Sequence, residues 1–127
     1  MPIKPQSAKQ KGNKLETIIA NFYARKLDPF AKRMPRSGAV EGFKADVLKR
    51  FYDSWKDECK ARKRFSIYDL FNQAVSQCSG IEKPVLHIKG DYKEPLTVIY
   101  TKDYFDMREE IHDWRKQNEI NRNKKVD

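Results

Sequence analysis

Apolar residues recur along this chain with two different periods. In three segments they lie three or four positions apart, which places them on one face of an α-helix. These segments predict helices over residues 13–26, 66–80 and 104–117. The second one begins with Ser66 and has Asp69 three positions later, a variant of the capping box that marks the start of a helix.

Other segments alternate apolar and polar residues or are rich in β-branched residues, which is typical of strands. Four such runs predict strands over residues 42–51, 55–62, 84–88 and 96–100. The pair Asp53-Ser54 predicts a hairpin turn between the first two runs. Asp57 falls on the apolar side of its run, and we expect it near the start of the strand, within reach of water.

The order of these elements is helix, two or three strands, helix, two strands, helix. Strands that are covered by helices on two sides make an α/β layer fold. A chain of 127 residues predicts a single domain. We expect a flexible basic arm over residues 1–12, the domain over residues 13–117 and a basic tail over residues 118–127.

The charge of the chain indicates what kind of partner it could bind. The chain has 27 lysines and arginines against 18 acidic residues, a formal net charge of +9. Such an excess favours a polyanion as partner, nucleic acid before an anionic membrane surface, with solubility alone as the alternative. There is no apolar signal segment and no run of membrane-spanning length, so we expect an intracellular protein without a membrane partner. The two cysteines, Cys59 and Cys78, are expected as free thiols.

Candidate chemistry is concentrated on a few charged residues. Glu58 and Lys60 are two positions apart on a predicted strand, so both side chains point to the same face. Asp46 lies in the preceding strand and Glu16 on the first helix. Clustered carboxylates with one lysine suit a magnesium-dependent phosphodiesterase, because the oxygens hold a hard cation and the lysine lies near the attacking water and the phosphate.

The order and spacing of several short motifs support this interpretation. They are Lys11-Gly12 with Glu16, the loop Pro35-Arg36-Ser37-Gly38, the run Gly42-Phe43-Lys44-Ala45-Asp46, Glu58 with Lys60, and a helix with Gln73 and Gln77. Over residues 11–105 the chain resembles the PD-(D/E)xK nucleases, and among them the archaeal-type and phage-type Holliday junction resolvases. Ala45 departs from the pattern, because it stands where the family name has proline.

The resemblance implies an α/β fold with a restriction-endonuclease-like mixed central sheet of about five strands, flanked by helices. It also implies a site for Mg²⁺, for which Mn²⁺ can substitute. The implied ligands are Asp46, Glu58, the backbone carbonyl of Cys59, and Glu16 directly or through water. Lys60 is similar to the lysine that orients the attacking water and stabilises charge at the phosphate. Ser37 is similar to a serine in a mobile loop of the resolvases, and Gln73 is a weaker match to a helix glutamine.

The function that the resemblance implies is hydrolysis of phosphodiester bonds in four-way or branched DNA, in the cytoplasm of a prokaryote or of a phage-infected cell. Paired cuts need two active sites and therefore a two-fold homodimer. Its contact would come from apolar faces of the second and third helices, with Tyr68, Phe71, Tyr104 and Trp114. Basic residues around the site are expected to bind DNA phosphates. They are Lys11, Lys14, Arg33, Arg36, Arg62, Lys63 and Arg64.

Two alternatives stay open for the function. One is a nuclease of the same fold that acts on duplex or single-stranded DNA, of the nicking, restriction or homing type. The other is a catalytically silent basic DNA-binding protein, which the intact set of acids disfavours because a binding module has no need of clustered carboxylates against DNA. RNA is also open as a substrate.

Each candidate residue also has an ordinary structural interpretation. Glu16 and Gln73 would then be solvated helix residues. Glu58 and Lys60 would form an exposed strand face, and Asp46 would pair with a neighbouring cation. Ser37 would contribute turn chemistry alone. The two histidines, His87 and His112, have no partner at ligand spacing, so we predict neither as a metal ligand or general base.

Overall fold

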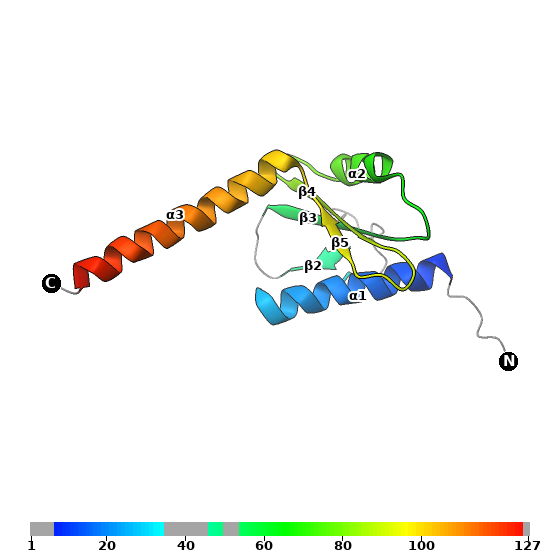
Figure 1. The fold of residues 1–127 in the computed structure, drawn as a ribbon. Helices are drawn as coiled ribbons and strands as arrows, with labels where there is room; N and C mark the ends of the chain where they lie inside the picture. Colours follow the sequence, from blue (N-terminus) through cyan, green and yellow to red (C-terminus); the bar gives the residue numbers. More distant parts are fainter. Residues whose placement is uncertain (1–6, 35–45, 50–53, 126–127) are drawn as a thin grey trace.

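The computed structural model describes residues 7–34, 46–49 and 54–125. The elements follow one another in the predicted order of helix, three strands, helix, two strands, helix (Figure 1). Their bounds are α1 (Ala8–Lys26), β1 (Lys32–Arg33), β2 (Val47–Leu48), β3 (Trp55–Ala61), α2 (Ile67–Ser76), β4 (Lys83–Lys89), β5 (Leu96–Val98) and α3 (Thr101–Lys125). The predicted α/β class is confirmed.

The described strands form two small sheets, whereas the resemblance implied one central sheet of about five strands. One sheet has the order β3-β4-β5, with β3 parallel to β4 and β4 antiparallel to β5, and the other pairs β1 with β2 antiparallel. Beside the free edge of β3, the backbone N–H of Asp46 donates to the carbonyl of Asp57 at 3.2 Å. The next donor on β3, the N–H of Cys59, binds the Asp46 carboxylate at 2.6 Å. The Asp46 side chain thus accepts a hydrogen bond that a backbone carbonyl of a neighbouring strand would accept in a regular β-sheet.

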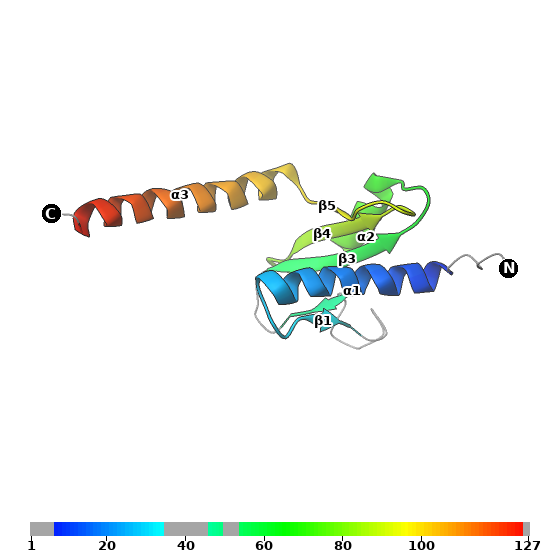
Figure 2. The same ribbon diagram turned by 60° about the horizontal axis from the view of Figure 1, so that its bottom comes forward.

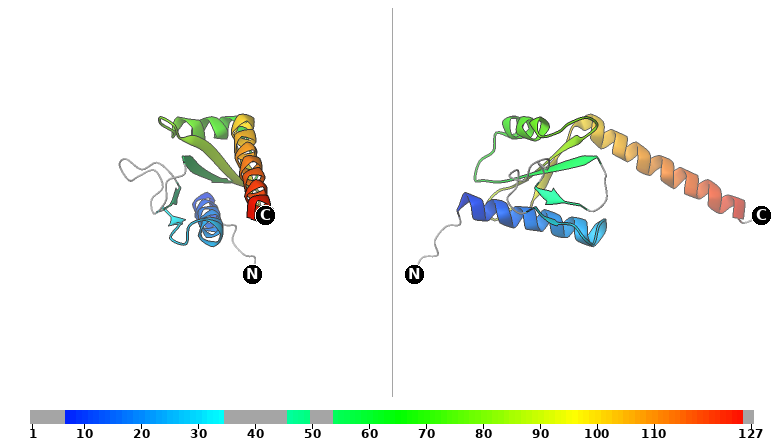
Figure 3. Two further views of the ribbon diagram at one scale, coloured as in Figure 1. Left: turned by 90° about the vertical axis from the view of Figure 1, so that its left-hand side faces the viewer. Right: turned by 180° about the vertical axis from the view of Figure 1, so that it is seen from behind.

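Two helices cover opposite faces of the larger sheet (Figure 3). On one face α1 packs against β3, in a core cluster formed by Leu15, Ile19, Ala20, Val47 and Cys59. On the other face α2 packs against β4, in a second cluster formed by Leu70, Phe71, Leu86 and Ile88. The central strand β4 is buried continuously from Pro84 to Ile88, as expected for a strand covered on both faces.

The first and last helices are longer than predicted. A full capping box starts α1, because the backbone N–H of Gln10 donates to Ser7 Oγ at 3.2 Å and that of Ser7 donates to Gln10 Oε1 at 3.0 Å. Residues 8–12 are therefore helical, although we had assigned them to a flexible arm. The helix α3 continues to Lys125, so most of the predicted basic tail is helical too. Both extensions are polar and lack the apolar period on which the prediction was based.

The helix α3 leaves the α/β layers and extends away from them (Figure 2). From Tyr104 to Lys124 every side chain is exposed except that of Asn118, which is half-buried. The predicted homodimer contact needs a correction here, because Phe71 is only 7% exposed and belongs to the core. Among the described residues, no helix has both the length and the apolar character that crossing a membrane requires.

Candidate active site

Three different elements carry the predicted carboxylates. Glu16 lies on α1, Asp46 directly precedes β2, and Glu58 lies on β3. Glu16 and Asp46 are 7% and 6% exposed, which is unusual for acids that would merely be solvated. The ordinary interpretation of Glu16 as a solvated helix residue is therefore wrong.

Each of these carboxylates contacts a positive or donating group of the chain itself. Arg33 Nη1 lies 3.3 Å from Glu16 Oε2, and Lys60 Nζ lies 3.3 Å from Glu58 Oε1. The backbone N–H of Cys59 binds Asp46 Oδ2, as described above. The contact between Lys60 and Glu58 confirms that their side chains share one face of the strand.

Electrostatics tie the three acids together. Burial raises the pKa of Glu58 above its ordinary 4.5, and the negative charges of Asp46 and Glu16 raise it further, while Lys60 opposes the shift. Burial also raises the pKa of the Cys59 thiol, and the same acids add to the effect. The neutral thiol of Cys59 is therefore favoured over the thiolate.

Carboxylate oxygens are the donors that Mg²⁺ prefers, so the chemistry of this set fits a hard cation. Within residues 7–34, 46–49 and 54–125, however, no three His, Cys, Asp or Glu side chains are arranged so that they could hold a metal ion. The structure brings Glu16, Asp46 and Glu58 within electrostatic range of one another but does not assemble them as ligands.

No protein-family model, curated protein or solved structure matches the chain. The functional assignment therefore depends on the residues and on their arrangement.

The remaining predicted site residues are less closely associated with the acids. Ser37 and Arg36 lie outside the described residues. Gln73 is exposed on α2, which covers the opposite face of the sheet from the helix that carries Glu16. The structure therefore separates the helix of Gln73 from that of Glu16, and α2 lies on the face of the sheet to which Glu58 and Lys60 point.

The predicted DNA-binding residues divide into two groups. Lys11 pairs with Asp91 at 2.9 Å, and Arg33 pairs with Glu16, so both cations already have acidic partners. Exposed cations remain on α1 and directly after β3. They are Lys14, Arg62, Lys63 and Arg64. These four are the described basic residues of the predicted set that are best placed to meet a phosphate backbone.

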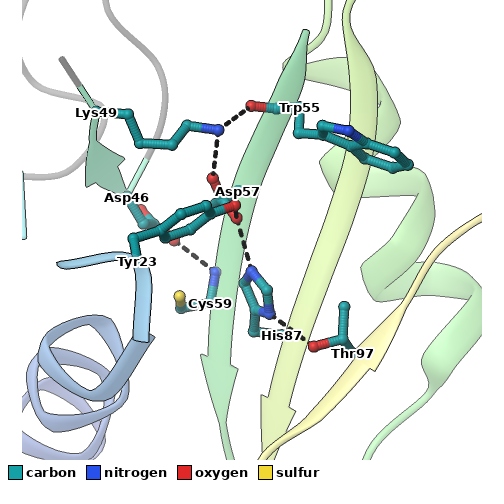
Figure 4. Close-up of polar contacts among 8 residues, drawn as sticks. All are labelled: Tyr23, Asp46, Lys49, Trp55, Asp57, Cys59, His87 and Thr97. Atoms are coloured by element: carbon teal, nitrogen blue, oxygen red, sulfur yellow. Dashed lines mark hydrogen bonds and ion pairs between the residues drawn. The ribbon is translucent and has the colours of Figure 1, made fainter. Parts of the chain in front are cut away.

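A second charged cluster, which the sequence did not predict, surrounds Asp57 on β3 (Figure 4). Asp57 is 0% exposed, so our expectation that water reaches it is wrong. Its Oδ1 lies 2.7 Å from the hydroxyl of Tyr23 and 2.7 Å from His87 Nε2. Lys49 Nζ lies 3.2 Å from Oδ2 as an ion pair that lacks hydrogen-bond geometry.

Asp57 is ionised in this cluster. Burial raises its pKa, but the hydrogen bond and charge of His87, the charge of Lys49 and the hydrogen bond from Tyr23 together lower it below the ordinary 3.8. His87 does have an acidic partner, contrary to the sequence-based expectation, and its Nδ1 lies 3.0 Å from Thr97 Oγ1. A signal was present in the sequence: Asp57 interrupts an otherwise apolar strand face, and His87 interrupts the apolar run from Pro84 to Ile88.

The Asp57 cluster holds the segment that carries Asp46. The backbone carbonyl of Asp57 accepts from Asp46 N–H, and its carboxylate pairs with Lys49, three residues further along the same segment. Lys49 Nζ also donates to the carbonyl of Trp55 at 2.7 Å. The buried acid therefore fixes β2 against β3 and, with it, the position of Asp46.

Proposed function

We propose that this protein is a metal-dependent endonuclease that hydrolyses phosphodiester bonds in branched DNA, in the manner of a Holliday junction resolvase. The observation that carries the proposal is the environment of Glu58. Its carboxylate is partly buried among two further acids that raise its pKa, and Lys60 lies 3.3 Å away. A stable fold has no need of mutually repelling acids around a partly buried carboxylate, whereas a cation site does.

The fold supports the same family. Hydrogen bonds join Asp46, which directly precedes β2, to β3, and the described strands include both parallel and antiparallel pairs. We include in the proposal that these five strands correspond to the mixed sheet of a restriction-endonuclease-like fold.

Each residue of the site has a defined role in this proposal. Asp46, Glu58 and Glu16 supply the oxygen ligands, with the backbone carbonyl of Cys59 as a further donor. Mg²⁺ or Mn²⁺, when bound, would neutralise charge on the scissile phosphate and lower the pKa of water. Lys60 stabilises negative charge at the phosphate, and its ion pair with Glu58 holds the ammonium in place. Ser37 remains a predicted loop contributor.

The exposed cations Lys14, Arg62, Lys63 and Arg64 supply sequence-independent, salt-sensitive attraction to the DNA backbone. Paired cuts at a junction need two such sites, so a two-fold homodimer is part of the proposal.

Three DNA substrates distinguish this function from its alternatives. The protein is incubated with a four-way junction, a linear duplex and a single strand, each with Mg²⁺, with Ca²⁺ and with excess chelator. We expect paired symmetric nicks in the junction alone, with Mg²⁺ alone, and DNA binding that survives chelation. Equal cutting of the duplex would move the assignment to a nuclease of the nicking or restriction type. Binding without cutting on every substrate would leave a silent DNA-binding protein, and an RNA junction tests for ribonuclease activity.

Glu58→Gln tests the metal site without any DNA. Because the folded protein raises the pKa of Glu58, this carboxylate destabilises the fold at neutral pH, and the penalty disappears as pH falls below the unfolded value of 4.5. We expect the variant to be more stable than the wild type at pH 7 in chelator, by about 0.5–1 kcal/mol, and equally stable at pH 4. Urea unfolding at both pH values measures the difference.

Added Mg²⁺ is expected to make the wild type more stable than Glu58→Gln at pH 7. A cation at 100 times its dissociation constant would stabilise the wild type by about 2.7 kcal/mol and the variant by much less. Glu119→Gln, an exposed change on α3, is the matched control and is expected to follow the wild type. If Mg²⁺, Mn²⁺ and Ca²⁺ left the wild-type unfolding curve unchanged, Glu58 would not belong to a metal site.

A further inference from the structure

Among the described residues, α3 has no packing partner over most of its length. It has 25 residues, which corresponds to about 37 Å, and its buried acid Asp103 lies in the first turn. Beyond its first turns it extends away from the other elements (Figure 1, Figure 2). A solitary helix is marginally stable in water, because most helical stability in proteins comes from packing an apolar face. The exposed part of α3 is therefore a candidate surface for a partner.

An apolar stripe runs along the exposed part of α3. Tyr104, Met107, Ile111 and Trp114 follow one another at spacings of three, four and three, and they are 40%, 37%, 47% and 66% exposed. This is the a/d pattern of a coiled coil, and it continues at the next a position with Asn118. A single polar Asn at an a position is the feature that specifies register and the two-stranded state in such pairs.

The residues that flank the stripe indicate the orientation of the partner. In this heptad Glu110 and Gln117 take g positions, and arginines take the e positions 108, 115 and 122. In a parallel pair each g residue faces the e residue five positions later on the other helix. Glu110 would then face the second copy's Arg115, and Gln117 would face the second copy's Arg122, on both sides of the pair. In an antiparallel pair the arginines at e would face one another and repel.

We propose that α3 forms a parallel, in-register, two-stranded coiled coil with α3 of a second copy of this chain, over residues 104–121. DNA is less suited to bind this stripe, because acidic residues outnumber basic residues over residues 101–113 and would repel its phosphates. The pairing follows from α3 alone and does not require nuclease activity. Its test contains no DNA. A dimer that forms through another surface would end this pairing and leave the nuclease proposal standing, whereas a monomeric wild type would count against both.

Self-association of the full chain is measured by sedimentation velocity across a concentration series. We expect a dimer for the wild type and at least a 100-fold weaker dimer for Ile111→Asp, which places a carboxylate in the stripe. Ile120→Asp is the matched control, since Ile120 is also exposed, at 41%, but lies off the stripe. It is expected to dimerise like the wild type. Urea unfolding checks that both variants keep the folded core.

Orientation is tested by a cysteine at the d position Asn121, in a Cys78→Ser background in which the other cysteine, Cys59, is buried. Mild oxidation is expected to join parallel, in-register helices by a disulfide in most molecules, because the two cysteines would face one another. A dimer that does not cross-link would overturn the parallel arrangement. A wild type that stays monomeric at hundreds of micromolar, or a dimer that Ile111→Asp leaves intact, would overturn the pairing itself.

Discussion

Replacing Lys60 by alanine is expected to lower the rate of DNA cleavage by about 100-fold to 1000-fold while the protein remains folded. The Lys60 ammonium lies 3.3 Å from Glu58 Oε1, and its side chain is 23% exposed, so substrate can reach it. Removing a single preorganised group that stabilises charge in the transition state typically has an effect of this size. The measurement is single-turnover cleavage of a labelled four-way junction with Mg²⁺ and saturating protein.

Lys63→Ala is the matched control, because Lys63 is an exposed lysine three residues further along the chain. It is expected to lower the affinity for DNA and to make that affinity less dependent on salt. The cleavage rate at saturating protein is expected to stay nearly unchanged. Asp46→Asn is expected to abolish cleavage as Lys60→Ala does, because Asp46 is a predicted metal ligand. Wild-type cleavage rates in either Lys60→Ala or Asp46→Asn would show that the site assignment is wrong.

The spacing of apolar residues predicted the strand and helix whose burial depends on neighbours in the sequence. The alternation over residues 55–62 gives β3 almost to the residue, because one face of that strand packs against α1. The stripe on α2 likewise buries Leu70, Phe71 and Ala74, as its period requires. Glu58 and Lys60 were placed together correctly, since residues two apart on a strand always share a face.

Contacts between distant residues could not be predicted in this way. Asp57 looked like a polar interruption near water, because its partners Tyr23 and His87 are 34 and 30 residues away in the chain. Arg33 and Lys11 were assigned to DNA, whereas the fold gives each of them an acid that the sequence does not indicate. The division of the described strands into two small sheets was not predictable either, because it depends on the Asp46 side chain, which takes a backbone donor of β3.

Strand β3 therefore carries two charged systems on its two faces. Glu58 and Lys60 point to one face and belong to the candidate site, and Asp57 points to the other face, toward α1. The exposed fractions separate them, since the Asp57 side chain is 0% exposed while those of Glu58 and Lys60 are 17% and 23% exposed. Substitutions on the two faces are accordingly expected to have different consequences, lost cleavage on one and lost stability on the other.

Asp57→Asn is expected to destabilise the fold by about 3–5 kcal/mol at pH 7, a large fraction of the stability of a domain this size. The substitution removes the negative charge that lies 3.2 Å from the Lys49 ammonium, whose side chain is only 9% exposed. The new amide would also direct donor hydrogens toward a cation. Urea unfolding followed by circular dichroism measures the change in the free energy of unfolding.

Two controls make this prediction specific to the buried charge. Asp113→Asn removes an acid whose side chain is 70% exposed, and it is expected to change stability by no more than about 0.5 kcal/mol. The pH dependence is the second control. Because folding lowers the pKa of Asp57, its charge contributes stability above the unfolded value of 3.8, and that contribution is lost as pH falls through the folded pKa. The difference in the free energy of unfolding between wild type and Asp57→Asn is therefore expected to decrease only below about pH 4. Equal stability of the two proteins at pH 7 would show that Asp57 does not anchor β2.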